Sequence, residues 1–260
     1  YPCKTPVAFL IFNRPETTRR VFAEIARARP PKLLVVADGP RPNSPGDQEL
    51  CKAVRAIIDG VNWNCELLTN YSEENRGCAV RVSSGIDWVF ENVDEAIILE
   101  DDCLPHPTFF RFCDEMLEKY RNDERIMAIS GDNFQSGRRR WEFSYYFSRY
   151  AHVWGWASWR RAWKHYDVGM SHWPFVRDGD WLSDMFENKR EAKYWAGVFD
   201  RVQRGEIDTW DYQWVFACWL HSGLSILPNV NLISNVGFGA NATHTDSGGA
   251  GDIALSEMAF

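Results

Sequence analysis

Three acidic residues directly follow an apolar run in the first half of the chain. The run covers 96–99, with the sequence Ala-Ile-Ile-Leu, and the acidic residues are Glu100, Asp101 and Asp102. A short apolar run that ends in polar residues predicts a buried strand, and in open α/β sheets ligands bind beyond the carboxyl ends of the strands. Three carboxylates at such a point repel one another and are costly to bury without a cation. The pattern predicts a Mn²⁺ or Mg²⁺ site, because these ions take oxygen ligands and bind substrate phosphates. A solvated acidic turn is the alternative.

Polar residues also follow two earlier apolar runs. Asn13 and Arg14 come after the run 7–12, and Asp38 comes after the run 33–37. Ligand sites of open α/β sheets lie at the carboxyl ends of the strands, so we expect all these polar residues at one sheet edge. Neither G-x-G-x-x-G nor the P-loop pattern follows the first strand, which argues against a dehydrogenase and a P-loop enzyme. A metal bound by Asp102 would then anchor the phosphates of a nucleotide.

The elements that must position these residues alternate along the first half of the chain. We predict strands at 7–12, 33–37, 65–69 and 96–100, with helices at 16–28, 47–59 and 76–91 between them. A helix at 107–121 and a strand at 126–130 continue the pattern. Such alternation predicts an α/β fold with a mostly parallel, twisted sheet flanked by helices.

The second half of the chain is less regular. We predict a strand at 143–147, helices at 159–166, 189–203 and 212–221, and two short strands within 224–233 that Pro228 separates. No internal repeat or linker is visible. We therefore expect one domain over 1–260, with a nucleotide-binding half at 1–131 and an acceptor-binding half at 132–260.

Composition narrows the class of protein. The chain has 260 residues, a formal net charge of −7 and 13 tryptophans. The negative charge argues against a nucleic-acid partner, and no segment has the length and apolarity of a membrane span. Seven cysteines at irregular spacing do not form a disulfide pattern, so we expect reduced thiols and a cytoplasmic protein. Association with a membrane through further parts of a longer chain is the alternative, and the oligomeric state stays open.

These motifs resemble those of the GT-A fold of nucleotide-sugar glycosyltransferases, and in particular the N-acetylglucosaminyltransferase I group, whose acidic motif is likewise Glu-Asp-Asp. Four segments carry the resemblance: Phe12-Asn13-Arg14-Pro15, Ala37-Asp38-Gly39, Asn75-Arg76-Gly77 with Arg81, and Leu99-Glu100-Asp101-Asp102-Cys103. Two downstream segments resemble the acceptor side of that group: Val153-Trp154-Gly155-Trp156 and Trp210-Asp211-Tyr212-Gln213-Trp214.

The resemblance implies how the donor would be bound. Asp38 would accept a hydrogen bond from a uracil N–H, and Arg14 would lie near the base or the diphosphate. Three residues of the third segment would line the nucleotide: Asn75, Arg76 and Arg81. Within the acidic motif, Glu100 would face the donor sugar or the waters of the metal, Asp101 would meet the ribose or the sugar, and Asp102 would bind the metal.

On the acceptor side the resemblance implies fewer roles. Asp211 would be the catalytic base, although an aspartate at the start of a helix is often only its N-cap. Trp154 and Trp156 could stack on a sugar or fill the core. Glycosyltransferases of this fold often bring a late histidine to the metal, which suggests His244 as a second ligand; a solvated side chain is the alternative.

The predicted function is a metal-dependent, inverting glycosyltransferase of polysaccharide biosynthesis that moves a hexosyl or N-acetylhexosaminyl group from a UDP-sugar to a saccharide or glycoconjugate. A metal would neutralise the leaving diphosphate, and inversion requires a base that takes the acceptor proton. A sugar-1-phosphate nucleotidyltransferase is one alternative, but that class needs a glycine-rich basic loop after the first strand. A non-catalytic carbohydrate-binding module is another, but it would be expected to lack the acidic motif.

Overall fold

The first hundred residues fold into alternating strands and helices. The computed structural model describes residues 1–135, 138 and 142–237. The elements of the first part are β1 (Val7–Ile11), α1 (Pro15–Ala28), β2 (Lys32–Ala37), α2 (Asp47–Ile57), the 3₁₀ helix η1 (Ile58–Gly60), β3 (Glu66–Tyr71), α3 (Cys78–Asn92) and β4 (Glu95–Glu100). Each predicted strand and helix of this part is confirmed, with ends displaced by a few residues at most.

The second part contains shorter elements. They are β5 (Cys103–Pro105), α4 (Thr108–Tyr120), β6 (Ile126–Ser130), β7 (Tyr145–Ser148), β8 (Trp156–Trp159), α5 (Arg160–Trp163), α6 (Trp173–Asp178), α7 (Trp181–Met185), α8 (Lys189–Gln203), α9 (Asp211–Leu220), β9 (Leu224–Pro228) and β10 (Ile233–Asn235). The predicted helix 159–166 is wrong in its first residue, because Trp159 ends a strand. That helix is also shorter than predicted, since α5 ends at Trp163.

Eight strands form one mixed sheet in the order β3-β2-β1-β4-β8-β6-β9-β7. β1, β2, β3 and β4 pair in parallel, and β8 is antiparallel to both of its neighbours, β4 and β6. β6 therefore points the same way as β4, and β9 is parallel to β6. Six of the eight strands (β1, β2, β3, β4, β6 and β9) thus share one direction, which confirms the predicted α/β fold with a mostly parallel sheet.

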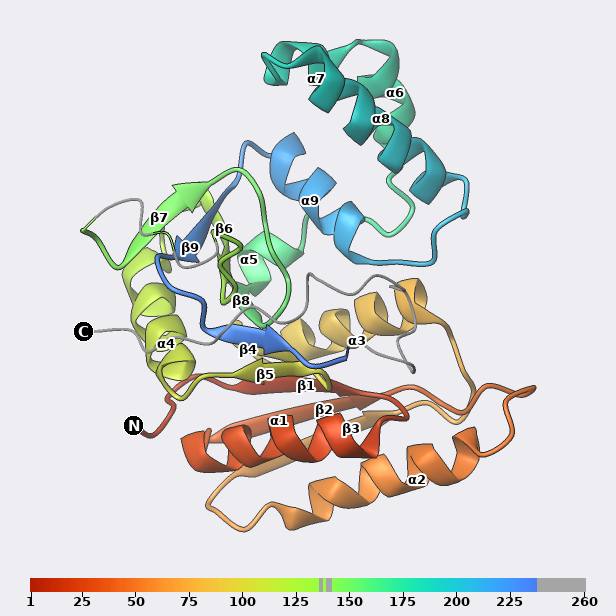
Figure 1. The fold of residues 1–260 in the computed structure, drawn as a ribbon, viewed down its shortest axis with the longest axis vertical. Helices are drawn as coiled ribbons and strands as arrows, with labels where there is room; N and C mark the ends of the chain where they lie inside the picture. The colour runs from red at the N-terminus through yellow and green to blue at the C-terminus, as the bar shows by residue number, and fades with distance from the viewer. Residues whose placement is uncertain (136–137, 139–141, 238–260) are drawn as a thin grey trace.

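Helices cover both faces of this sheet (Figure 1). α1, α2 and α4 pack on one face, where Phe9, Val35 and Phe109 belong to one buried cluster. α3, α5 and α9 pack on the other face, and α6, α7 and α8 lie beyond α9, farther from the sheet. Alternation along a strand explains the two clusters, since Ala8 and Leu10 face the second layer while Phe9 faces the first.

Tryptophans fix α9 against the sheet. The ring of Trp156 in β8 is fully buried and lies 5.7 Å from both Trp210 and Trp214, between ring centroids. Trp163 of α5 lies 5.1 Å from Trp214 and stacks on Tyr166 at 4.2 Å. This cluster holds the first turn of α9 close to the middle of the sheet.

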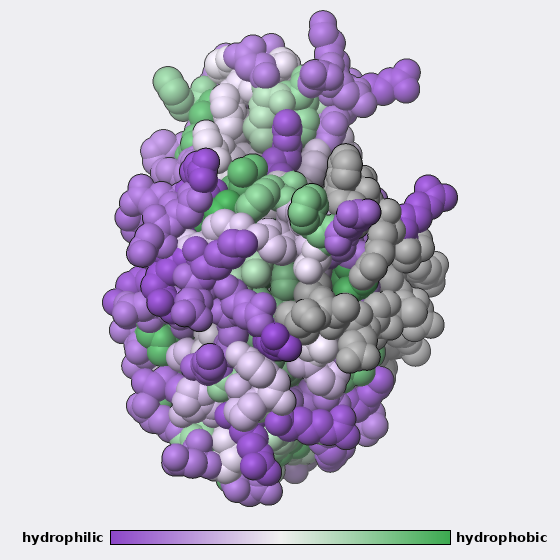
Figure 2. All heavy atoms as spheres, turned by 90° about the vertical axis from the view of Figure 1, so that its left-hand side faces the viewer, coloured by the Kyte–Doolittle hydropathy of each residue, from purple (hydrophilic) through white to green (hydrophobic). Residues whose placement is uncertain are grey.

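The surface is mixed in character. Hydrophobic residues reach the face shown in Figure 2 in separate patches among hydrophilic ones, mostly in its upper half. None of the helices in the described part of the chain is long and apolar enough to cross a membrane. All seven cysteines are free thiols.

Candidate active site

The carboxyl ends of three adjacent parallel strands form the candidate site. Ile11 at the end of β1 pairs with Ala37 at the end of β2, and Leu10 pairs with Glu100 at the end of β4. Neighbouring strands lie about 4.8 Å apart. The segments that leave these ends, with Arg14, Asp38 and the acidic motif 100–102, therefore start within about two strand spacings of one another.

Arg14 holds two members of the acidic motif. Its Nη1 lies 2.6 Å from Asp102 Oδ2 and 3.7 Å from Asp101 Oδ1. The backbone N–H of Phe12 donates to Asp101 Oδ2 at 3.0 Å. The loop after β1 is thereby tied to the end of β4 through one arginine and one amide, and the side chain of Arg14 remains 23% exposed.

The acidic motif carries more negative charge than its neighbours balance. Burial raises the pKa of Glu100 well above its usual range, and the charges of Asp102, Asp101 and Asp211 act in the same direction. Burial, followed by the charge of Asp102, also raises the pKa of Asp101, against the effects of Arg14 and of the Phe12 N–H. Among the described residues, the guanidinium of Arg14 is the one that acts on all three carboxylates, so a further cation would stabilise their charged forms.

The residues fit a cation that is held partly by a substrate, and they do not form a complete protein cage. In the part of the chain that the structure describes, no three His, Cys, Asp or Glu side chains are grouped to hold a metal together. One or two carboxylates with substrate phosphates are the ordinary ligand set of Mg²⁺. Asp102 can supply such a carboxylate, because Arg14 contacts its Oδ2 while, among the described residues, its Oδ1 is contacted by the Cys103 thiol alone, at 3.5 Å.

The chain after β10 passes directly over this motif. The N–H of Val236 donates to the backbone oxygen of Asp102 at 2.8 Å. A Cβ at Gly237 would overlap the carboxylate of Asp102, so only glycine fits this close approach. His244, predicted as a metal ligand, lies outside the described residues.

Asp38 connects the loop after β2 to the loop after β3 through hydrogen bonds. Its carboxylate accepts hydrogen bonds from the N–H of Gly39 at 2.8 Å, from the N–H of Arg76 at 3.0 Å and from Asn75 Nδ2 at 3.0 Å. A Cβ on Gly39 would approach the backbone of Glu74 to 2.5 Å, so the two loops are in close contact. Burial raises the pKa of Asp38, although these N–H donors oppose the shift.

Two other residues predicted to line the nucleotide differ in exposure: Arg81 is buried, whereas Arg76 is exposed. Arg81 is 6% exposed, and its guanidinium donates to the backbone oxygens of Ala37 and Asn70, at the ends of β2 and β3. Arg81 therefore supports the sheet edge instead of facing a ligand. Arg76 is exposed beside it, and its cation can reach an anion.

Asp211 is the first residue of α9. Its Oδ1 accepts hydrogen bonds from the N–H of Tyr212 at 2.9 Å and from the hydroxyl of Thr209. Its charge contributes to the raised pKa of Glu100 and also to that of Tyr166, for which burial is the larger cause.

The two tryptophans predicted for the acceptor differ in exposure. Trp156 is fully buried within the tryptophan cluster, so its ring cannot meet an acceptor, and its core alternative holds. Trp154 is half-buried at the site edge, with the ring of Phe134 edge-on at 5.1 Å. Only Trp154 of this pair is placed where a sugar could reach it.

Sequence reasoning missed a pair of polar residues at the same edge. His152 Nδ1 lies 2.5 Å from Asp132 Oδ1, and the carboxylate of Asp132 is 1% exposed. Asp132 follows the end of β6, so the strand-end rule that selected Asp38 could have found it. Its contact with His152 joins positions twenty residues apart, and no local sequence pattern predicts that contact.

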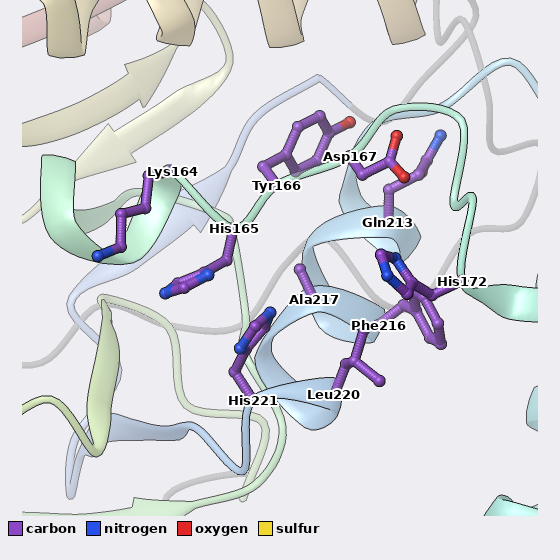
Figure 3. Close-up of a pocket in the computed structure, with 10 residues that line it drawn as sticks. All are labelled: Lys164, His165, Tyr166, Asp167, His172, Gln213, Phe216, Ala217, Leu220 and His221. Atoms are coloured by element: carbon purple, nitrogen blue, oxygen red, sulfur yellow. The ribbon is translucent and has the colours of Figure 1, made fainter. Parts of the chain in front are cut away.

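A separate pocket lies along α9. It encloses about 320 Å³ and includes Gln213, which is 3% exposed, together with Lys164 and His172. The rings of His165 and His221 face each other there, 3.9 Å apart between centroids (Figure 3). None of the residues given a catalytic, donor, acceptor or metal role from the sequence lines this pocket, although Gln213 belongs to the downstream segment 210–214.

Comparisons with known proteins give similarity to solved structures alone. No protein-family model and no curated protein matches the sequence. A mannosyltransferase from Pyrobaculum calidifontis, solved with GDP-Man and Mn²⁺, is 15% identical with a TM-score of 0.41, over 61% of this chain and 45% of that chain. Mouse xyloside xylosyltransferase 1 is 11% identical with a TM-score of 0.38, over 82% and 80% of the two chains.

A UDP-glucose pyrophosphorylase complexed with UDP-glucose is also similar, at 9% identity and a TM-score of 0.32, over 62% of this chain and 70% of that chain. This chain thus spans less than half the length of the mannosyltransferase. At such identities and TM-scores the three similarities do not assign an activity to this chain.

Proposed function

We propose that this chain is a nucleotide-sugar glycosyltransferase with a GT-A-type site at the carboxyl edge of its sheet. The observation that carries the proposal is the ion pair between Arg14 and Asp102, which joins the loop after β1 to the acidic motif after β4. A cationic and an anionic group side by side at a strand-end edge suit a diphosphate and its counter-ion.

The chain's own cations would bind the diphosphate of the donor. Arg14 remains partly exposed beside the acidic motif, and Arg76 is exposed on the neighbouring loop. Arginine presents a planar set of donors that matches phosphate oxygens. Both would lower the cost of negative charge on the leaving nucleoside diphosphate as the bond to the sugar breaks.

Asp102 would hold a Mn²⁺ or Mg²⁺ ion in the loaded enzyme. Such an ion supplies charge neutralisation for the diphosphate when it is bound. Asp102 would contribute Oδ1, while Arg14 keeps Oδ2 in place and so orients the carboxylate. His244 is proposed as a second ligand from the sequence alone.

The base of the donor is proposed to be uracil, held near Asp38. Because four N–H donor contacts already reach its carboxylate, Asp38 would act mainly by shaping the loops 39–46 and 72–77, and Asn75 supports it. Asp101 would meet the ribose or the sugar, and Glu100 would face the sugar. The transferred group is proposed to be a hexosyl or N-acetylhexosaminyl unit.

The acceptor is proposed to be a saccharide or glycoconjugate bound beside Trp154, and the reaction is proposed to invert the anomeric centre. Trp154 and Phe134 offer neighbouring aromatic surfaces, and such faces pack on the apolar side of sugar rings. Asp211 is the base predicted from the sequence, and its charge helps to raise the pKa of Glu100.

Calorimetry with UDP tests the donor site. UDP should bind in the presence of Mn²⁺, and EDTA should weaken that binding at least tenfold. The Asp102→Asn variant should bind UDP with no dependence on Mn²⁺. The exposed Asp184 in α7 provides the matched control, and Asp184→Asn should behave like the wild type.

Two results would contradict parts of this proposal. Equal UDP affinity with Mn²⁺ and with EDTA would remove the metal from the site. Formation of a UDP-sugar from UTP and a sugar 1-phosphate, with no transfer from UDP-sugars, would identify a nucleotidyltransferase instead.

A further inference from the structure

Asp132 and His152 form an oriented acid–base pair at the sheet edge. The ring nitrogen Nδ1 of His152 lies 2.5 Å from Asp132 Oδ1. Asp132 is 1% exposed, whereas the His152 side chain is 24% exposed. A buried carboxylate that binds Nδ1–H fixes the imidazole so that Nε2, on the opposite edge of the ring, keeps its lone pair.

The surroundings hold the imidazole rigidly. The hydroxyl of Ser130 donates to the backbone oxygen of His152 at 2.8 Å and accepts from its N–H at 3.1 Å. The ring of Phe134 lies 4.9 Å from that of His152, between centroids. Among the described residues, two side chains contact the imidazole: the charged Asp132, which follows β6, and the apolar Phe134.

The register of the sheet places this pair level with the acidic motif. Ile98 in β4 and Ser130 in β6 both pair with Trp156 of β8. Glu100 lies two residues beyond Ile98, and Asp132 lies two residues beyond Ser130, at the same edge. β4 and β6 are separated by β8 alone, which is a lateral distance of about 10 Å at ordinary strand spacing.

A donor sugar and an acceptor hydroxyl fit between groups at such a distance. Trp154 stands beside this pair, because it and His152 both contact Phe134. The Oδ1 of Asp211 already accepts two hydrogen bonds, from Thr209 and Tyr212. The imidazole of His152 lies near Trp154, the aromatic residue proposed for the acceptor, because both rings contact Phe134.

We propose that His152 is the catalytic base of the transfer reaction and that Asp132 is its positioning residue; this inference rests on the proposed function. The acceptor oxygen forms a bond to the anomeric carbon while the bond from that carbon to the diphosphate oxygen breaks. The electron pair of the broken bond leaves on the diphosphate. The hydroxyl proton moves to Nε2 of His152 and then passes to solvent, which the exposed part of the ring can reach.

Variants at three positions test this assignment with the UDP-sugar that the wild type turns over. His152→Gln should lower kcat by about 10² to 10⁴, the usual contribution of a general base, while the Kd for UDP changes less than about twofold. Asp211→Asn should lower kcat less than His152→Gln does. His172, exposed and distant in sequence from the pair, provides the control, and His172→Gln should keep the wild-type rate.

The Asp132→Asn variant tests whether Asp132 positions His152 for catalysis or only stabilises the fold. The asparagine keeps the size of the side chain but loses its charge, so kcat should fall while the KM for the donor stays within about twofold. A purely structural pair would lower the melting temperature, and kcat per folded molecule would stay at the wild-type value.

Imidazole ¹⁵N spectra give a readout without turnover. The neutral ring of His152 should carry its proton on Nδ1, and Asp132→Asn should weaken that preference. The inference is overturned if the proton sits on Nε2, or if His152→Gln transfers at the wild-type rate. Absence of UDP release from every UDP-sugar by the wild type would instead overturn the proposed function, and this inference with it.

Discussion

Arg14 is the residue on which the donor site depends most. Its guanidinium is the positive charge placed against Asp102 at 2.6 Å, and three carboxylates share it. Arg14→Ala should therefore weaken UDP binding at least tenfold, and Arg14→Lys should recover part of the loss, because an ammonium cannot reproduce the planar donor set. Calorimetry measures both. Arg19→Ala, on the exposed face of α1, is the control, and equal losses from the two alanine variants would contradict the account.

Trp154 and Trp156 form a matched pair for separating binding from stability. Trp156 is fully buried, so Trp156→Ala should cost about 3–5 kcal/mol of unfolding free energy. Trp154 is half-buried, so Trp154→Ala should cost about 1 kcal/mol and should raise the KM for the acceptor. Urea unfolding and acceptor titrations check the two claims. An unchanged acceptor KM in Trp154→Ala would remove that residue from the acceptor site.

For single residues, the sequence predicts which residues lie at the site better than it predicts where their side chains point. The acidic motif and Asp38 could be selected because each follows an apolar strand. The sequence could not predict that the carboxylate of Asp38 accepts hydrogen bonds from the loop 72–77. Those bonds depend on the close packing of Gly39 against that loop, which is distant in sequence. The burial of Trp156 likewise depends on three distant tryptophans: Trp163 in α5, Trp214 in α9, and Trp210 just before α9.

Among the elements, the ones with clear periodicity were predictable. The strand 126–130 and the helix 189–203 have the predicted ends. β8 was missed because all four of its residues are buried, which removes the alternation that marks a half-exposed strand. β5 is three residues long and gives no periodicity at all.

α2 supports the loop that carries Arg14. Asp47, its first residue, accepts from Asn13 Nδ2 at 2.9 Å and forms an ion pair with Arg41 at 2.6 Å. The hydrogen bond from Arg41 lowers the pKa of Asp47. A lowered pKa in the folded state stabilises the fold above the unfolded pKa of about 4, and this contribution is lost as the pH falls through the folded value.

Asp47→Asn should therefore destabilise the protein in a pH-dependent way. The expected loss is about 1–2 kcal/mol at pH 7, and the difference between variant and wild type should shrink at pH values below about 4. Urea unfolding at pH 7 and pH 3 measures it. Glu49→Gln, an exposed change in the same helix, should have little effect at either pH. An equal loss from Asp47→Asn at both pH values would show that the charge of Asp47 is not the cause.

The topology of the whole molecule was partly predictable. Alternating strands and helices indicated a mostly parallel sheet, and six strands do share one direction. The insertion of β8, antiparallel between β4 and β6, could not be read from the pattern. That insertion brings Trp154 and His152 to the edge where the acidic motif lies, so the acceptor side of the site depends on a long-range pairing.

Ligand binding should be visible in the stability of the whole molecule. A ligand at 100 times its Kd adds about 2.7 kcal/mol to the free energy of unfolding. For a chain of this size that corresponds to a rise in melting temperature of about 5–10 °C. UDP and Mn²⁺ together should produce this rise in the wild type, and Asp102→Asn should lose most of it. Equal rises in the wild type and in Asp102→Asn would place the ligand away from the acidic motif.

Release of nucleoside diphosphate from a panel of nucleotide sugars tests the central claim most directly. In the presence of Mn²⁺ the wild type should release UDP from at least one UDP-sugar, faster when a saccharide acceptor is added. Asp102→Asn should lose at least 99% of this rate, whereas Asp184→Asn should retain it. Absence of release from every nucleotide sugar by the wild type, or an undiminished rate in Asp102→Asn, would contradict the account.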